Sequence, residues 1–185
     1  CEFLGSVDTL IAASKLKSLV YEQPIEQNGK LSVYERPFKD RDYIVTVDVA
    51  RGVSKDYSAF VVVDITHFPY RVVATFKDNE IKPMLFPSVI EDVAKAYNNA
   101  YVLCEVNDIG DQVASILFYD LEYENLLMVA MRGRAGQIVG SGFSGVKTQL
   151  GVKMSTTTKK VGCSNLKTLI EEDKLTFCDY NIISE

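Results

Sequence analysis

The chain has 185 residues, of which 47% are hydrophobic, and a net charge of −5 at pH 7. This length and apolar content suit one globular domain with a sizeable core, and no apolar run approaches the roughly 20 residues that a membrane-spanning helix needs. A single histidine and four cysteines without a C-x-x-C spacing leave little material for a zinc site or a histidine-based catalytic triad.

Residues 1–40 read as a lead-in segment outside the main core. A short helical pattern covers Asp8 to Leu19, and a polar connection that contains Pro24 and Pro37 follows it. The beginning has neither a start methionine nor the basic-then-apolar order of a secretory signal. We therefore expect this segment to connect the domain to a longer protein.

Three neighbouring strands are predicted after the lead-in, because Val, Ile, Phe and Tyr are enriched there. The expected strands are residues 43–48, 58–65 and 71–76. Their closeness in the sequence favours an antiparallel meander.

Helices and strands alternate in the next part of the chain. Apolar residues recur at helical spacing from Pro87 to Tyr97 and from Asp111 to Tyr119, with a short strand, Tyr101 to Glu105, between them. A strand, a helix and a return strand form a parallel crossover. The ends of strands 43–48 and 101–105 are therefore expected to lie side by side.

The last part of the chain is predicted to hold one more helix between two short strands. The strands are residues 126–129 and 175–178, and the helix runs from about Lys159 to Glu172 after a capping run at Ser155 to Thr158. The whole order predicts an α/β fold, with a mixed central sheet flanked by helices.

Two acidic residues stand at strand ends, Asp48 on the first strand and Glu105 on the fourth. Burying a carboxylate among Val and Ile costs several kcal/mol unless a cation or hydrogen-bond donors compensate for it. Hard oxygen ligands of this kind suit Mg²⁺, with room for substrate phosphates. The alternatives are a turn cap for Asp48 and a surface ion pair for Glu105.

Three further acids and one amide lie close to this pair in the sequence. Asp56 is a candidate third ligand or an acid that orients water, or else an ordinary residue of a polar turn. Asp108 and Asp111 precede a helix, which favours N-capping. We read Asn107 as a turn residue.

The segment from Ala130 to Lys167 carries seven basic residues and no acidic one, although the chain as a whole is acidic. Two interpretations are open, a solvated loop or a surface that neutralises DNA phosphates without reading the base sequence. With a metal site nearby we favour DNA contact. The candidate DNA-binding residues are Arg132, Arg134, Lys147, Lys153, Lys159 and Lys160.

Several of these segments together resemble one family. Residues 47–52 (VDVARG) with 56–58 (DYS), and 104–110 (CEVNDIG), are similar to the nuclease domain of the large terminase subunit of tailed bacteriophages, closest to the T4-like group. Residues 1–6 (CEFLGS) resemble the sequence that follows the ATPase domain in that family. The resemblance covers nearly the whole chain. It implies a ribonuclease H-like nuclease domain in 41–185, with 1–40 as the linker from an N-terminal ATPase domain.

The resemblance implies a metal-dependent endonuclease that cuts double-stranded concatemeric viral DNA with low sequence specificity. Asp48 and Glu105 match two of the family's three catalytic acids, which hold Mg²⁺ or Mn²⁺, and Asp56 would support them. The third family acid lies in a helical segment beyond the final short strand, and neither Asp179 nor Glu185 matches it convincingly. We therefore expect the domain to continue past residue 185.

The same resemblance implies a set of partners and a location. The partners are double-stranded DNA, the ATPase domain of the same full-length chain, the capsid portal and the small terminase subunit, without a membrane, in the host cell cytoplasm. No G-x-x-x-x-G-K-[ST] loop is present, so this piece is not expected to turn over ATP.

Two other functions compete with the nuclease. One is a non-catalytic docking or DNA-translocation domain that contacts the portal and DNA. The other is a sugar-kinase or actin-like phosphotransferase, which needs a second such half and glycine-rich phosphate turns after the first acid. Only Gly52 stands there in this chain.

Overall fold

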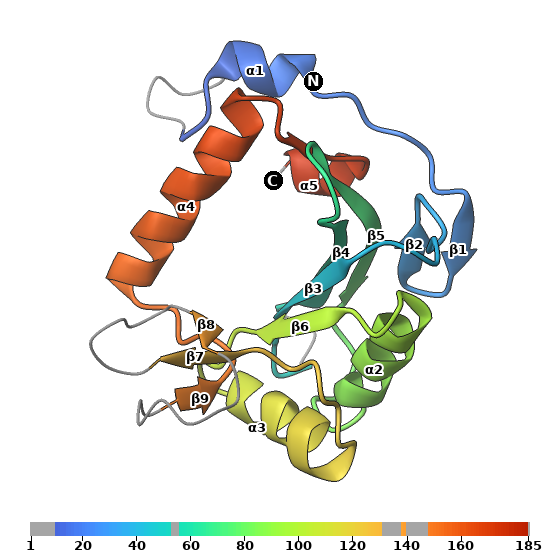
Figure 1. Ribbon diagram of the computed structural model, residues 1–185, viewed down its shortest axis with the longest axis vertical. Coiled ribbons are helices and arrows are strands. Elements are labelled where there is room, and N and C mark those ends of the chain that lie inside the picture. The colour runs from blue at the N-terminus through green and yellow to red at the C-terminus, as the bar shows by residue number, and fades with distance from the viewer. Residues whose placement is uncertain (1–9, 53–55, 131–137, 140–147, 185) are drawn as a thin grey trace.

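The computed structural model of the protein describes residues 10–52, 56–130, 138–139 and 148–184. In these ranges a curved central sheet carries helices α2 and α3 on one side, while α4 runs past its other side (Figure 1). No described helix is long and apolar enough to cross a membrane. The helical elements are α1 (Ala13–Ser18), α2 (Phe86–Ala96), α3 (Gly110–Ser115) with the π-helical turn η1 (Ile116–Asp120), α4 (Thr156–Glu171) and α5 (Tyr180–Ser184).

The strands in the described ranges form two sheets. The larger has the order β1-β2-β5-β4-β3-β6, with β10 paired to β5 outside this path, and the smaller has the order β8-β7-β9. Their bounds are β1 Glu26–Asn28, β2 Leu31–Val33, β3 Tyr43–Asp48, β4 Ser58–Asp64, β5 Tyr70–Asp78, β6 Tyr101–Cys104, β7 Met128–Ala130, β8 Ile138–Val139, β9 Thr148–Leu150 and β10 Leu175–Thr176.

The central sheet matches the topology predicted from the sequence. Strands β3, β4 and β5 form an antiparallel meander, and β6 returns parallel to β3 after the crossover through α2. The predicted mixed α/β fold is confirmed.

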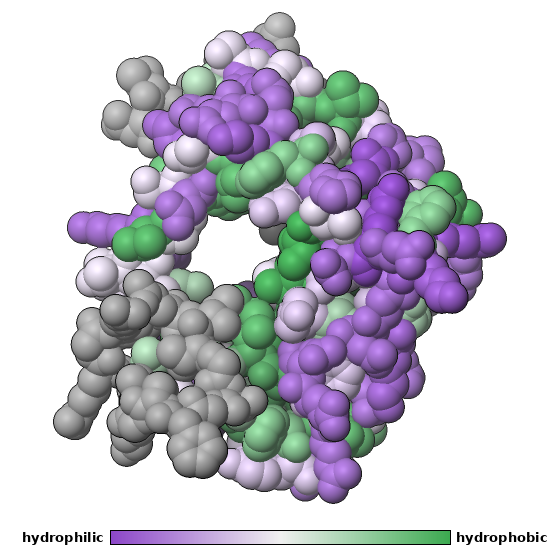
Figure 2. Space-filling view, in the orientation of Figure 1, coloured by the Kyte–Doolittle hydropathy of each residue, from purple (hydrophilic) through white to green (hydrophobic). Residues whose placement is uncertain are grey.

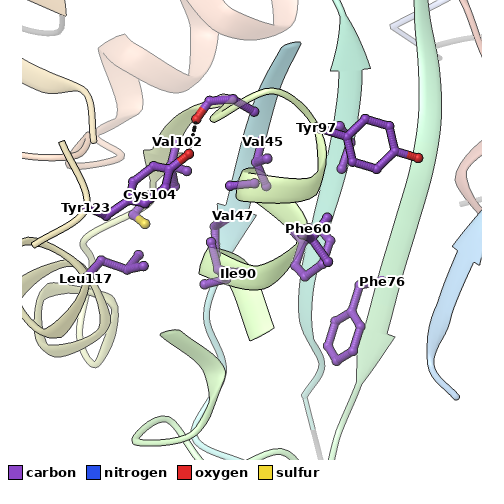
Figure 3. Packing of buried hydrophobic residues seen from close by; sticks show 14 of the residues in the cluster. Val45, Val47, Phe60, Phe76, Ile90, Tyr97, Val102, Cys104, Leu117 and Tyr123 are labelled. Carbon is purple, nitrogen blue, oxygen red and sulfur yellow. Dashed lines mark hydrogen bonds between the residues drawn. The ribbon is translucent and has the colours of Figure 1, made fainter. Parts of the chain in front are cut away.

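Alternation along the strands separates a core face from a second face. On β3, Tyr43, Val45 and Val47 are buried, and the residues between them point the other way. The buried set packs against α2, α3 and η1 in one apolar cluster (Figure 3). Within it Phe60 and Phe76 stack with ring centroids 5.0 Å apart. The core therefore occupies one face and leaves the second available for a site.

The lead-in segment contributes more structure than the sequence analysis expected. Residues 26–33 form the hairpin β1–β2, and β2 pairs antiparallel with β5. The prediction of a plain connection over these residues was wrong. Each strand is only three residues long, and Glu26, Gln27 and Asn28 carry no apolar signal. Pairing with the edge of β5, which is remote in sequence, makes them strands.

The strand predicted at residues 126–129 also differs from the observed one. Strand β7 is Met128–Ala130 and belongs to the smaller sheet, where it pairs with β8 and β9. Only an isolated bridge between Leu126 and Val102 links this segment to β6. The sequence pattern indicates a strand but not which sheet it joins.

Two cysteines behave as buried small apolar residues, as predicted. Burial raises the pKa of the Cys104 thiol to about 12 and that of Cys178 to about 11. Both are free thiols, and at such pKa values neither is a ready nucleophile near neutral pH.

Candidate metal and nucleic-acid site

Asp48 and Glu105 lie side by side at the ends of two parallel neighbouring strands. The register pairs Val47 with Cys104, and the Glu105 N–H donates to the Val47 carbonyl at 2.9 Å. Val47 and Cys104 are buried in the core, so the next residue on each strand faces the other way. Both acids line one cavity of about 390 Å³ on the second face.

The acid pair is more accessible than the sequence analysis expected. Asp48 is exposed and Glu105 is half-buried. The expectation of carboxylates enclosed by Val and Ile was wrong, because both side chains turn away from the core face where their strands end. In the space-filling view the molecule is open between α4 and the central sheet, and green apolar residues border the sheet side of the opening (Figure 2).

The charges of the pair are only partly balanced by the protein. Burial and the negative charge of Asp48 raise the pKa of Glu105 above its ordinary value, and the positive charge of Lys159 offsets part of this rise. The like charge of Asp48 disfavours the ionised form of Glu105. A cation placed between them would remove this penalty, so the donor set fits a divalent metal ion.

The backbone of Glu105 lies at the junction of the two sheets. On its other side from β3 it forms a parallel bridge with Val152. The Val152 N–H donates to the Cys104 carbonyl at 2.8 Å, and the Val106 N–H donates to the Val152 carbonyl at 2.9 Å. The end of β6 is therefore held from both sides.

Two glycines allow this close packing. A Cβ on Gly110 would lie 2.0 Å from the Glu105 carbonyl oxygen, and a Cβ on Gly151 would lie 2.3 Å from the Cys104 carbonyl oxygen. Gly151 also has a φ of +71°, a conformation that other residues rarely adopt. Any larger residue at either position would displace the backbone that carries the acid.

Asn107 fixes the segment that leads into α4. Its side chain donates to the Met154 carbonyl at 3.1 Å and accepts from the Met154 N–H at 2.9 Å. Ser155 then caps the helix by accepting from the Thr158 N–H at 3.1 Å, as predicted. The interpretation of Asn107 as a turn residue was incomplete, because its partner is 47 residues away in the chain.

A bidentate ion pair joins the loops that follow strands β3 and β6. The Arg51 Nε and Nη2 atoms donate to the Asp108 carboxylate at 2.7 and 2.6 Å. The guanidinium holds the pKa of Asp108 below its ordinary value. The prediction of Asp108 as an N-cap was wrong, since Ile109 is the N-cap residue of α3 and makes no side-chain cap. Asp111 lies in the first turn of that helix.

The remaining predicted acids are not gathered around the pair. Asp56 is exposed and lines neither of the two cavities on this face. In the described ranges, no three Asp, Glu, His or Cys side chains form a group that could hold one metal ion. Asp179 is buried and accepts from the Thr75 hydroxyl at 2.6 Å and the Asn181 N–H at 2.7 Å.

The predicted basic residues fall into two groups. Lys153, Lys159 and Lys160 are exposed, just before α4 or in its first turns. Only Ile170 of this helix is buried, so α4 offers most of its surface to a partner. The second group lies outside the described residues and consists of Arg132, Arg134 and Lys147. The acidic residue Glu185 lies outside them as well.

A second cavity of about 590 Å³, which the sequence analysis missed, adjoins the first on the same face. The two share Asp48, Ala59, Phe60 and Val61. Its far wall comes from the β1–β2 hairpin and from α5, whose residues are remote from Asp48 in the sequence. The unpredicted pairing of β2 with β5 brings in the hairpin, and the parallel pairing of β10 with β5 brings in the segment that leads to α5.

Comparisons with known proteins give a consistent picture. A family model for the terminase RNase H-like domain matches residues 45–185. The fold is similar to the large terminase nuclease from thermophilic phage G20c with bound cobalt, with a TM-score of 0.70 and 23% identity over 98% of this chain and 80% of that chain.

Two further solved structures share this fold. The G20c large terminase nuclease with bound magnesium has a TM-score of 0.69 and 22% identity, over 97% of this chain and 79% of that one. The large terminase nuclease domain of Thermus phage P74-26 has a TM-score of 0.64 and 24% identity, over 93% and 74%.

Proposed function

The chain belongs to the terminase RNase H-like domain family, and from this premise and the geometry of the acid pair we propose that it is a divalent-metal-dependent DNA endonuclease domain. The substrate is double-stranded viral DNA, cut with low sequence specificity during packaging. The observation that carries the proposal is the placement of Asp48 and Glu105 on adjacent parallel strands, lining one cavity.

Asp48 and Glu105 are the ligands in this proposal, and the ion is Mg²⁺ or Mn²⁺. Carboxylate oxygens are the donors that such hard cations prefer, and two carboxylates leave coordination positions for waters and a phosphate. When bound, the ion supplies charge neutralisation at phosphorus and a water of lowered pKa. The solved G20c nucleases with bound cobalt and magnesium support a divalent ion in this fold.

The remaining residues of the site would bind and orient the substrate. The positive charge of Lys159 lowers the pKa of Glu105, so the same charge would attract a phosphate bound at the acids. Lys153 and Lys160 extend the positive surface next to it. Backbone contacts of this kind give affinity without reading bases, which fits low sequence specificity.

Four more residues have roles in this proposal. Three of them lie outside the described residues, and the fourth, Asp56, lines neither cavity. Arg132, Arg134 and Lys147 complete the DNA-contacting segment, and Asp56 orients water from the neighbouring turn. A third metal ligand is proposed to come from residues after the final strand, as the family resemblance implies. The proposed partners are the ATPase domain of the same protein, the portal and the small terminase subunit, in the host cytoplasm.

The test is nicking and linearisation of a supercoiled plasmid by the chain, with Mg²⁺ or Mn²⁺ and with an EDTA control. Asp48→Asn is compared with Asp92→Asn, which changes an exposed acid on α2. We expect metal-dependent cutting that Asp48→Asn loses and Asp92→Asn retains. If the protein continues past residue 185, the longer chain is assayed in parallel and is expected to cut faster.

Two outcomes would contradict the proposal. Equal cutting by the wild type and Asp48→Asn would exclude this site as the catalytic centre. No metal-dependent cutting by any version, with normal folding by circular dichroism, would favour the non-catalytic docking or translocation domain.

A further inference from the structure

We propose that Ser58 is a positioning residue for the metal site, because it fixes the chain that leaves Asp48. This inference rests on the proposed nuclease function and adds to it a residue that acts through one of the two proposed ligands. Ser58 is the first residue of β4 and is 1% exposed. Asp48 is the last residue of β3, and it pairs with Ala59, the residue after Ser58.

The Ser58 hydroxyl continues the contact between the two strands beyond their last backbone pair. The Ala50 N–H, two residues after Asp48, donates to the Ser58 Oγ at 3.0 Å, and this hydroxyl donates to the Ala50 carbonyl at 3.3 Å. One side chain thus bonds both backbone groups of Ala50 in place of a strand partner. Asp48 is therefore held between the strand pairing on one side and the Ser58 contact on the other.

Ser58 lies on the core face of the sheet, opposite to the proposed ligand. Ser58 and Phe60 are buried on β4, and Ala59 between them lines the first cavity together with Asp48. Ser58 lines neither of the two cavities on the second face. Any effect of Ser58 on the site must therefore pass through the backbone, and not through contact with the ion or the substrate.

A second contact holds the same stretch of chain but is more exposed. Arg51, next to Ala50, pairs with Asp108, and the two side chains are 67% and 60% exposed. Exposed ion pairs contribute little, whereas hydrogen bonds shielded from water are stronger. Removing the Ser58 hydroxyl would also leave the N–H of the buried Ala50 without this partner. Ser58 is therefore the contact whose loss should move Asp48 most.

The opposite end of β3 offers a matched control. The Asp42 N–H donates to the Thr66 Oγ1 at 2.9 Å, and this hydroxyl donates to the Asp42 carbonyl at 3.5 Å. Asp42 directly precedes β3, whereas Ala50 follows it. Two hydroxyls thus make the same pair of bonds to residues that flank one strand, and only Ser58 does so beside Asp48.

Titration of Mn²⁺ alone into the metal-free chain, followed by isothermal titration calorimetry, tests the inference. Ser58→Ala is expected to raise the Kd for Mn²⁺ about tenfold, as for other residues that orient metal ligands. Ser58→Cys keeps a weaker hydrogen-bonding group of similar size and should raise Kd about threefold. Thr66→Ala should leave Kd within about twofold, because its bonds lie at the far end of the strand. Circular dichroism verifies that each variant is folded.

The outcomes separate this inference from the proposed function. A Kd for folded Ser58→Ala within twofold of the wild type, or an equal rise in Thr66→Ala, would overturn the positioning role and leave the nuclease intact. If Ser58→Ala does not fold, Ser58→Cys decides in the same way. A wild type that binds no Mn²⁺ would overturn the proposed metal site, and the role of Ser58 with it.

Discussion

The two ends of the central sheet carry acidic residues in opposite electrostatic surroundings. Asp64 ends β4 and Asp48 ends its antiparallel neighbour β3, so they lie at opposite ends. Asp64 is buried and accepts from the Arg41 Nη1 at 2.7 Å and the Thr66 N–H at 3.0 Å. Burial by itself raises the pKa of Asp64, but the hydrogen bonds from Thr66 and Arg41 outweigh it and hold that pKa below its ordinary value.

At the other end the balance is reversed. Burial and the charge of Asp48 raise the pKa of Glu105, and Lys159 offsets only part of the rise. A strand-end acid that the fold neutralises is a structural residue, whereas a pair that the fold leaves short of positive charge is suited to bind a cation. If the proposed function is correct, the partners of an acid, rather than its place on a strand, separate the two roles.

The largest expected difference is in the cleavage rate when Asp48 or Asp64 is replaced by its amide. Asp48→Asn is expected to lower plasmid cleavage by roughly a hundredfold or more, because the charge stabilisation supplied by a bound metal is worth several kcal/mol. Asp64→Asn should retain cleavage per folded molecule, since it lies at the far end of the sheet. The measurement is the initial rate of linearisation with saturating Mg²⁺. A comparable loss in both variants would remove the distinction.

Asn107→Ala tests whether the clamp on Met154 positions the site. Loss of two hydrogen bonds to half-buried backbone groups should lower the free energy of unfolding by about 1 to 3 kcal/mol. Cleavage should fall by roughly 10- to 100-fold, as for other residues that orient ligands. Thermal melts and cleavage rates measure the two effects. Asn107→Asp keeps the acceptor for the Met154 N–H and should recover part of the rate; no recovery would indicate a purely structural role.

The hydrogen bonds of Asp64 predict that its contribution to stability depends on pH. The lowered pKa of Asp64 means that its stabilising effect is present above the ordinary value of 3.8 and is lost as the pH falls through the folded-state pKa. Asp64→Asn should cost about 1 to 2 kcal/mol near neutral pH, since Arg41 is partly exposed. Urea unfolding at pH 7 and near pH 3 checks this, and a difference that persists unchanged at the lower pH would argue against an ionic origin.

At Glu105, removal of the charge is expected to have a small effect of opposite sign on the free energy of unfolding. The raised pKa of Glu105 means that its charged form destabilises the metal-free fold above its ordinary value of 4.5. Glu105→Gln should therefore raise the free energy of unfolding at pH 7 in EDTA, by less than about 1 kcal/mol because water screens the half-exposed pair. Urea unfolding measures it, with Glu124→Gln as the control, and a destabilised Glu105→Gln would refute the repulsion.

Local pattern was sufficient to predict the main parts of the fold and the acid pair. Alternating β-branched residues predicted β3 to β5, and helical spacing predicted α2 and α3. The parallel crossover predicted that Asp48 and Glu105 would lie side by side. Each of these signals lies within about ten residues of sequence or follows from a general rule of connection.

Contacts between remote segments could not be predicted from the sequence. The hairpin at residues 26–33 exists because of β5, and the partner of Asn107 is Met154. The Arg51 to Asp108 pair also joins loops that no short motif connects. The second cavity depends on the hairpin, so it could not be predicted either. These features depend on tertiary packing that propensity and spacing do not encode.

The close packing of Gly110 and Gly151 around the end of β6 makes the register of this strand decisive for the site. Side chains alternate strictly along a strand, so sliding β6 by one residue against β3 would place Cys104 in the cavity and turn Glu105 into the core. The observed register is held by the hydrogen bonds of Val152 and Val106 and by the close approach of the two glycines to the Cys104 and Glu105 carbonyls. The facing of both carboxylates into one cavity therefore depends on the backbone register of β6, so substitutions that never touch the acids can still move them apart.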